Sequence, residues 1–128
     1  MQQPLLVLVV EDELLVQEMV KEALSEGGFE AEFFPSGEEA VALLEKHPDR
    51  YRAVITDINL PELSGWEVAR RARELKSDMP VVYMTGAAAD QWTSQGVPGS
   101  VLLQKPFAPA QVITAISQLL NQTLPPHE

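Results

Sequence analysis

Residues 5–13 read LLVLVVEDE, six apolar residues followed directly by three acidic ones. An unbroken apolar run of this length is typical of a strand that is buried on both faces of a sheet. Three more short runs have the same character, at Ala53–Thr56, Val81–Met84 and Val101–Leu103. Residues Glu30–Phe34 alternate between polar and apolar side chains, which indicates a more exposed strand. The sequence therefore predicts five strands.

Helical patterns fill the intervals between these strands. The first contains two adjacent rows at a spacing of four residues, Leu15, Met19, Ala23 and Val16, Val20, Leu24, and Gly27-Gly28 ends it. Two helices are predicted to begin near residues 37 and 65, each after a Ser-x-x-Glu capping box, Ser36 with Glu39 and Ser64 with Glu67. A last helix begins with Pro109 in its first turn. Residues 87–95 form the weakest helical pattern.

Strand and helix thus alternate five times. This order predicts a parallel sheet covered by helices on both faces, a three-layer α/β sandwich with right-handed crossovers. Ligands of such folds bind outside the carboxyl ends of the strands, where the strand order reverses. The residues that follow each strand are therefore the candidates for a functional site.

Composition limits the classes of function. The 128 residues suit a single domain, with a core at about residues 5–120, a flexible tail at 123–128 and no output domain. There is no cysteine, and the formal charge of −10 disfavours a basic nucleic-acid surface. No apolar run approaches the roughly 20 residues of a membrane span, so we expect a cytoplasmic protein without membrane contact.

Charged and hydroxyl side chains follow four of the predicted strands. Glu11 and Asp12 follow the first strand, Asp57 the third, Thr85-Gly86 the fourth and Lys105 the fifth. Carboxylates gathered at one sheet edge repel one another unless a cation compensates them, and Mg²⁺ or Mn²⁺ favours such oxygen ligands. A carboxylate nucleophile, a divalent ion, a lysine and a hydroxyl are together the groups that phosphoryl transfer needs. Gly86 is expected to leave space for a substrate.

Five short motifs in this order resemble the receiver domain of two-component response regulators. They are Val9-Val10-Glu11-Asp12, Thr56-Asp57-Ile58-Asn59-Leu60-Pro61, Leu63-Ser64-Gly65, Met84-Thr85-Gly86 and Lys105-Pro106-Phe107. No single motif is specific, but their combination at the ends of the right strands is. The resemblance covers the chain from about Leu5 to Leu120. It implies a flavodoxin-like fold with strand order 2-1-3-4-5 and a cis peptide bond between Lys105 and Pro106.

The same resemblance implies a role for each motif residue. Asp57 would accept a phosphoryl group from a phosphohistidine, with Thr85 and Lys105 as partners of the new group. Glu11, Asp12, Asp57 and the backbone carbonyl of Asn59 would bind the metal ion. Thr85, Gly86 and position 102 would form the switch that alters the surface of the last two helices and the strand between them. Such a domain is a signalling phosphoacceptor that catalyses its own phosphorylation and dephosphorylation, and it is not otherwise an enzyme.

Two departures from the receiver pattern concern the output. The family usually has Tyr or Phe three residues before the lysine, and Leu102 occupies that position here. The stretch from Thr85 to Lys105 is also short and contains Gly96, Pro98 and Gly99, which predicts a short or irregular fourth helix. One interpretation is output through backbone movement alone. The other is an altered partner surface anchored by Trp92, although packing is the better expectation for this side chain.

The expected partners are a sensor histidine kinase or a histidine phosphotransfer protein, and a downstream protein. The chain fits either a stand-alone regulator or the receiver module of a hybrid kinase, and the altered fourth helix leaves homodimer formation open. Two alternatives remain. A phosphatase of the haloacid dehalogenase kind needs a second Asp where Asn59 lies, and a pseudo-receiver is expected to lack Asp12, Asp57 or Lys105, all of which are present.

Overall fold

Strands and helices alternate along residues 5–122, the part of the chain that the computed structural model describes. In chain order the elements are β1 (Leu5–Val10), α1 (Leu14–Glu26), β2 (Phe29–Phe34), α2 (Gly37–Lys46), β3 (Ala53–Asp57), α3 (Gly65–Leu75), β4 (Val81–Thr85), η1 (Ala89–Gln91), α4 (Trp92–Gln95), β5 (Val101–Gln104) and α5 (Pro109–Gln122). All five predicted strands are present, each within one residue of its expected bounds. The predicted tail at 123–128 lies outside the described residues.

The five strands form one parallel sheet in the order β2-β1-β3-β4-β5. This order confirms the predicted flavodoxin-like architecture. The chain first winds from β1 to β2 on one side and then crosses to β3 on the other, so the direction of winding reverses at β1. Ligands of doubly wound sheets bind at such a reversal, beyond the carboxyl ends of the strands. The ends of β1 and β3 are therefore the place to look for a site.

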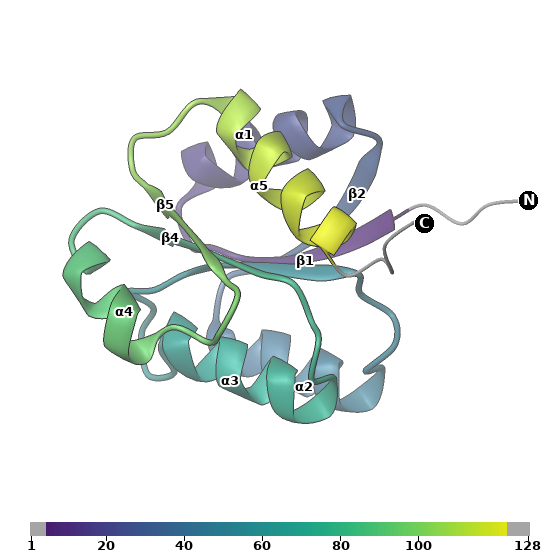
Figure 1. Cartoon of the computed structure of the whole chain (residues 1–128), viewed down its shortest axis with the longest axis vertical. Coiled ribbons are helices and arrows are strands. Elements are labelled where there is room, and N and C mark those ends of the chain that lie inside the picture. The colour runs from purple at the N-terminus through teal and green to yellow at the C-terminus, as the bar shows by residue number, and fades with distance from the viewer. Residues whose placement is uncertain (1–4, 123–128) are drawn as a thin grey trace, which may run out of the picture.

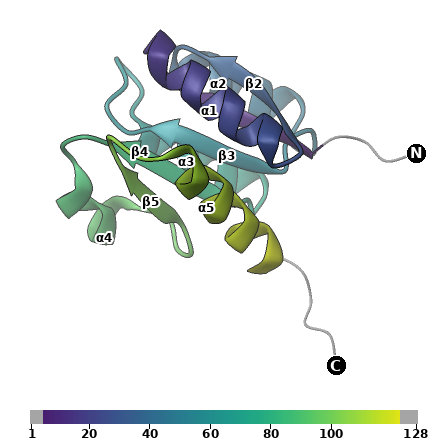
Figure 2. The same ribbon diagram turned by 90° about the horizontal axis from the view of Figure 1, so that it is seen from above.

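Helices cover both faces of the sheet, as Figures 1 and 2 show. Helices α1 and α5 lie on one face, where Val20, Leu24, Val112 and Ile116 pack on the sheet residues Val7, Val9 and Ile55. Helices α2 and α3 and the short α4 lie on the other, where Leu44, Val68 and Ala72 pack on Leu8, Val10 and Val54. Each central strand thus contributes apolar side chains to two cores, which explains the unbroken apolar runs in the sequence.

Serine side chains cap the helices that were predicted to begin near residues 37 and 65. The backbone N–H of Glu39 donates to Ser36 Oγ at 3.3 Å, and that of Glu67 donates to Ser64 Oγ at 3.4 Å. In a full capping box the Glu39 carboxylate would accept from the backbone N–H of Ser36; here it accepts from the Ser36 hydroxyl instead, at 3.2 Å. Each cap still satisfies one free amide of the first helical turn.

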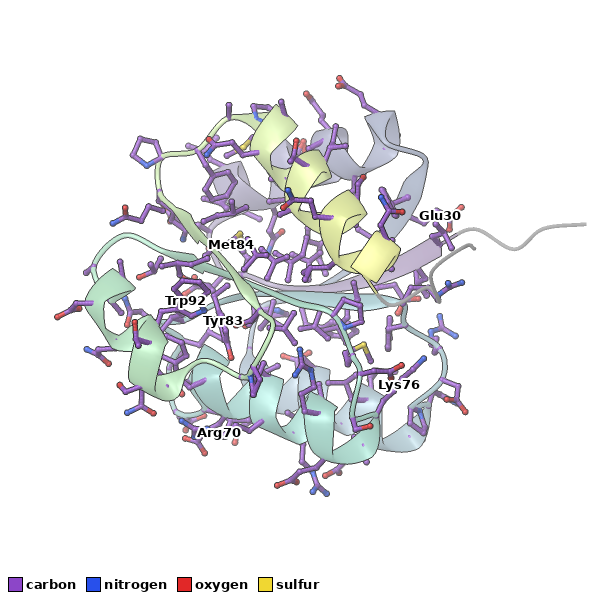
Figure 3. All side chains as sticks on the ribbon, in the orientation of Figure 1. Glu30, Arg70, Lys76, Tyr83, Met84 and Trp92 are labelled. Atoms are coloured by element: carbon purple, nitrogen blue, oxygen red, sulfur yellow. The ribbon has the colours of Figure 1, made fainter. Side chains whose placement is uncertain are left out.

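The fourth helix is short, as predicted. It consists of the 3₁₀ turn η1 and the four-residue α4, and Gly96 follows it. Trp92 is half-buried against the α2/α3 core, and its Nε1 donates to Ser100 Oγ at 3.0 Å. Figure 3 places Trp92 close to Tyr83 on the inner side of α4. The expectation that Trp92 is a packing residue is therefore confirmed.

One predicted core position of α1 is wrong. Leu15 was expected to share a buried row with Met19 and Ala23, yet it is 82% exposed, and its neighbour Leu14 is 75% exposed. Leu14 and Leu15 lie on the solvent side of the first turn of α1, whereas Val16 in the same turn packs against the core between α1, α5 and the sheet. None of the described helices is long and apolar enough to cross a membrane.

Candidate functional site

Three carboxylates gather where β1 and β3 end. Glu11, Asp12 and Asp57 each offer one oxygen, and these atoms all lie within 4.8 Å of one another. Glu11 is fully buried, Asp57 is 6% exposed and Asp12 is exposed. The predicted grouping of these residues is confirmed, because parallel strands bring their carboxyl ends to one edge.

Hydrogen bonds hold Glu11 in its buried position. Its backbone N–H donates to the carbonyl of Phe34 at 3.0 Å, and its Oε2 accepts from the backbone N–H of Glu13 at 3.0 Å. Gln17, one turn into α1, donates from Nε2 to the Glu11 carbonyl at 2.6 Å. The carboxylate thus has a fixed direction, and its second oxygen, Oε1, accepts from the ammonium group of Lys105 at 3.1 Å.

Asp57 is the last residue of β3, and a glycine lies against its backbone. A Cβ atom on Gly65 would lie 2.1 Å from the carbonyl oxygen of Asp57 and 2.9 Å from Cα of Ile58. The backbone N–H of Gly65 also donates to the Ile58 carbonyl at 3.0 Å. Only glycine allows α3 to begin so close to this strand end, which fixes the backbone that carries Asp57.

Lys105 lies between the carboxylates, as predicted. Its Nζ is 3.1 Å from Glu11 Oε1, 3.5 Å from Asp57 Oδ1 and 3.9 Å from Glu13 Oε1. Its backbone N–H donates to the Thr85 carbonyl at 2.7 Å, and the following peptide bond to Pro106 is cis, as the resemblance implied. Glu13 is mainly exposed and lies at the margin of the cluster.

The Thr85 hydroxyl faces the backbone of the loop that follows β4. Its Oγ1 accepts from the backbone N–H groups of Ala87 at 3.1 Å and Ala88 at 2.8 Å. Gly86 is exposed, and a Cβ atom there would meet nothing within 4 Å. There is open space beside Gly86, as expected, but an alanine side chain would also fit there.

Two further predicted residues flank this site. Asn59 is exposed two residues after Asp57, and the role of its carbonyl as a metal ligand stays a prediction. Leu102 is half-buried on β5 and packs on the α2/α3 core, where its strand partner is Tyr83. No aromatic ring occupies position 102, but one lies directly beside it on the neighbouring strand.

Burial sets the protonation behaviour of the cluster. It is the main cause that raises the pKa of Glu11; the Glu13 amide opposes this effect and the Asp57 carboxylate adds to it. Burial also raises the pKa of Asp57, and Lys105 opposes it. For Lys105 itself, burial would lower the pKa, but Asp57 and Glu11 outweigh this effect and the pKa is raised. The positive charge of Lys105 alone therefore does not balance the negative charges of the clustered carboxylates.

Additional positive charge would relieve this imbalance. Three oxygens within a few ångströms, with two of the carboxylates raised in pKa, suit a hard divalent cation such as Mg²⁺ or Mn²⁺. Such an ion takes a few protein oxygens and keeps other positions for water or phosphate oxygens. Glu11, Asp12 and Asp57 are the residues that would hold it.

We expect the metal-free protein to lose stability as pH rises through the mildly acidic range. Because the folded pKa values of Glu11 and Asp57 are raised, the native state binds more protons than the unfolded state between their ordinary and raised values. The free energy of unfolding should fall with pH across that window. Urea unfolding at several pH values, with EDTA or with Mg²⁺, measures this slope.

Mg²⁺ should reduce the pH dependence of the free energy of unfolding, because it favours the ionised carboxylates of the native state. Glu11→Gln should remove part of the slope, whereas Glu26→Gln at the far end of α1 serves as a control outside the cluster. Equal slopes with and without Mg²⁺ would contradict the proposed cation site.

Sequence reasoning missed several residues that shape this site. Gln17 braces Glu11, and Thr56 donates from Oγ1 to the Asp57 carbonyl at 2.9 Å. Gly65 was recognised only as part of a motif, although a glycine at the first position of the helix that follows Asp57, eight residues later, can signal a close approach of two backbones. Gln17 and Thr56 have no such signal, since their partners depend on the tertiary structure.

Comparison with known proteins gives a consistent result. A family model described as the response regulator receiver domain matches residues 7–117. Response regulator MprA of Mycolicibacterium vanbaalenii is 32% identical over 124 residues, which cover 95% of this chain and 53% of that protein. The chain thus spans about half the length of the curated relatives that it matches.

Solved structures show the same likeness. A response regulator receiver protein from Sinorhizobium medicae is 41% identical, with a TM-score of 0.89, covering 93% of this chain and 96% of that chain. A response regulator receiver domain protein from Clostridium thermocellum is 26% identical, with a TM-score of 0.83 and coverages of 91% and 94%.

Proposed function

Because this chain belongs to the response regulator receiver domain family and acts in two-component signalling, we propose that Asp57 is its phosphoacceptor. The observation that carries the proposal is the group of charged side chains around the Asp57 carboxylate. It lies within 4.8 Å of two further carboxylates that suit a divalent ion, and 3.5 Å from the ammonium group of Lys105.

The proposed reaction transfers a phosphoryl group from a phosphohistidine. An oxygen of Asp57 attacks phosphorus, the bond between phosphorus and the histidine nitrogen breaks, and the electron pair leaves with the imidazole, which can take a proton. Lys105 is placed to pair with the transferred oxygens, and a bound Mg²⁺ would neutralise charge on the same group. Hydrolysis of the resulting acyl phosphate at the same site would return the domain to its first state.

Thr85 would report the phosphorylated state. Its hydroxyl now accepts from the amides of Ala87 and Ala88. A phosphoryl group on Asp57 offers strong acceptor oxygens, and the Thr85 hydroxyl would turn to donate to them. The two amides would then lose their acceptor, so the start of η1 would move. Output would therefore pass to a downstream protein through the surface of α4, β5 and α5.

The test is intact-mass analysis of the protein with acetyl phosphate and Mg²⁺. We expect a single phosphoryl adduct that requires the divalent ion and decays after the donor is removed. Absence of an adduct with any small donor would favour a pseudo-receiver that only binds partners. Many turnovers of a phosphoester such as p-nitrophenyl phosphate would favour a phosphatase of the haloacid dehalogenase kind.

The expected donor is a sensor histidine kinase or a histidine phosphotransfer protein. Leu14 and Leu15 support a docking position beside the acidic cluster, since they are the large apolar side chains most exposed among the described residues and follow Glu13 directly. An exposed apolar pair next to a reactive site is typical of a contact surface for a partner.

Leu15→Ala should slow phosphotransfer from a protein donor at least about fivefold, the effect of losing about 1 kcal/mol of contact energy. Acetyl phosphate should still label the variant at the normal rate, because this donor is too small to need the leucine. The measurement uses a panel of autophosphorylated histidine kinases and follows transfer from the best of them. Gln118→Ala, at an exposed position of α5, is the control, and equal loss with both donors would contradict a docking role.

A further inference from the structure

Three hydrogen bonds, from the two elements α3 and β4, join the segment 92–100 to the rest of the domain; this segment contains α4 and the turn into β5. Arg70 of α3 donates to the side chain of Gln95 at 2.6 Å, and Arg73 donates to the Pro98 carbonyl at 2.8 Å. The third tie comes from the sheet, because the backbone N–H of Val97 donates to the hydroxyl oxygen of Tyr83 at 3.0 Å.

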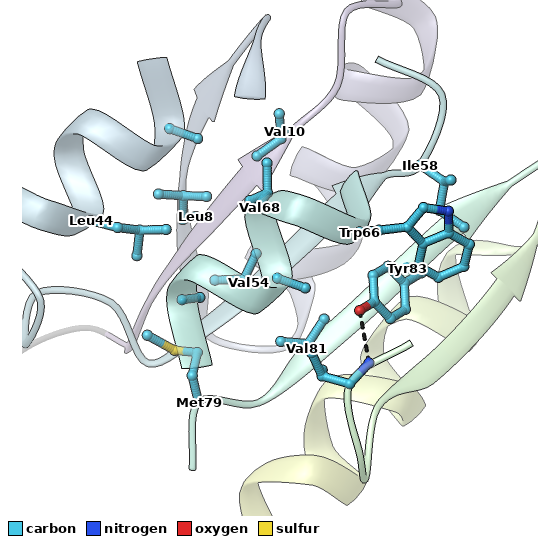
Figure 4. Packing of buried hydrophobic residues seen from close by; sticks show 14 of the residues in the cluster. Leu8, Val10, Leu44, Val54, Ile58, Trp66, Val68, Met79, Val81 and Tyr83 are labelled. Carbon is cyan, nitrogen blue, oxygen red and sulfur yellow. Dashed lines mark hydrogen bonds between the residues drawn. The ribbon is translucent and has the colours of Figure 1, made fainter. Parts of the chain in front are cut away.

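Tyr83 differs from the two arginines because it reaches the segment from inside the core. Its side chain is fully buried, and its ring packs on Trp66 of α3 with centroids 4.8 Å apart and planes at 56°. Figure 4 shows the hydroxyl aimed from this cluster at the nitrogen of Val97. A buried hydrogen bond of this kind fixes one backbone position of the segment.

Tyr83 also lies beside the position where the receiver pattern usually has its aromatic residue. In the sheet Tyr83 is paired with Leu102, so the aromatic side chain is on β4 rather than β5. Tyr83 and Thr85 are two residues apart on β4, so they share a face of the sheet.

A short path connects Thr85 with this cluster. The Thr85 hydroxyl accepts from the Ala88 amide at 2.8 Å, and the Ala88 side chain is buried in the same core cluster as Tyr83, Trp66 and Val97. Loss of that hydrogen bond would therefore disturb the packing around the Tyr83 ring, not only the exposed surface of η1.

We propose that Tyr83 is the positioning residue that couples Thr85 to the segment 92–100, in place of an aromatic residue at position 102. The inference rests on the proposed phosphorylation of Asp57. When the Thr85 hydroxyl leaves Ala88, the cluster shifts and the hydrogen bond between Tyr83 and Val97 weakens. The segment 92–100 then loosens and presents a changed surface to the downstream partner.

Hydrogen exchange at the Val97 amide tests this coupling. In the wild type, acetyl phosphate with Mg²⁺ should speed the exchange several-fold. In Tyr83→Phe, which keeps the ring and removes the hydroxyl, exchange should be fast in both states and the phosphorylation-dependent difference should vanish. The amount of phosphoryl adduct should equal that of the wild type. Gln95→Ala, which removes only the Arg70 tie, should keep the difference.

Several results would overturn the inference. If Tyr83→Phe keeps the wild-type difference, or if Gln95→Ala loses it as fully, Tyr83 has no special role. An adduct on the wild type without any change at Val97 overturns this inference alone, whereas no adduct overturns the proposed function with it.

A second variant covers the case in which Tyr83→Phe does not fold. Thr85→Val removes the acceptor of the Ala88 amide, so Val97 in the unphosphorylated variant should exchange as fast as in the phosphorylated wild type. Exchange equal to that of the unphosphorylated wild type would contradict the coupling.

Discussion

Asp57→Asn is expected to abolish the phosphoryl adduct completely while the domain keeps its fold. An amide of nearly the same shape fills the space of the carboxylate, but it is not a nucleophile toward phosphorus. Lys105 keeps its contact with Glu11 at 3.1 Å, so it is not left without a partner. Intact mass after incubation with acetyl phosphate and Mg²⁺ measures the effect.

The same variant should be at least as stable as the wild type at neutral pH without metal. Burial raises the pKa of Asp57, so the ionised carboxylate opposes folding there, and the neutral amide removes that cost. Asp78→Asn, on an exposed residue before β4, is the control and should be labelled fully. A full adduct on Asp57→Asn would place the acceptor on another residue, and Asp12 would then be the first to test.

Gly65→Ala should have the largest effect on stability. The added Cβ would lie 2.1 Å from the Asp57 carbonyl oxygen and 2.9 Å from the Asp57 carbonyl carbon and from Ile58 Cα. All three neighbours are backbone atoms of a central strand end, so relief requires α3 to move. We expect a loss of about 3 kcal/mol in the free energy of unfolding and a fall of roughly 10 °C in Tm.

Gly86→Ala is the matched control for stability, because its Cβ would meet nothing within 4 Å. Its effect should stay within about 1 kcal/mol and can be stabilising. Thermal unfolding by circular dichroism compares the two variants. Similar Tm values for both would show that α3 can shift at little cost. Gly65→Ala should also slow labelling of Asp57, since the shift displaces the backbone that carries it.

The fold was predictable because its signals are local. Apolar runs such as Leu5–Val10 have to be buried on both faces, and residues such as Ser36 and Pro109 mark helix starts by their own backbone chemistry. The acidic cluster was predictable for a related reason, since parallel topology alone brings Asp12 and Asp57 to one edge.

The residues that were predicted wrongly or missed have surroundings that depend on the tertiary structure, which the hydrophobic periodicity of the sequence does not describe. Leu15 fits the apolar row of α1, but which side chains of the first turn reach the core depends on how the helix start is placed on the sheet: Val16 packs there and Leu15 does not. Tyr83 reads as one more residue of a buried strand, and its partner Val97 lies 14 residues away. The amides that the Thr85 hydroxyl accepts from were not predicted either, and the role of this hydroxyl at a phosphorylated Asp57 stays a prediction.

The two edges of the sheet limit how this domain can associate. One edge is β2, which carries Glu30 and Glu32, and the other is β5, with only four residues. Charged side chains and short edge strands both discourage strand addition from another molecule. Self-association by continuing the sheet from one copy to the next is therefore disfavoured at either side. Any pairing of two copies should instead use helix surfaces, which can change with the state of the domain without risking fibrous aggregation.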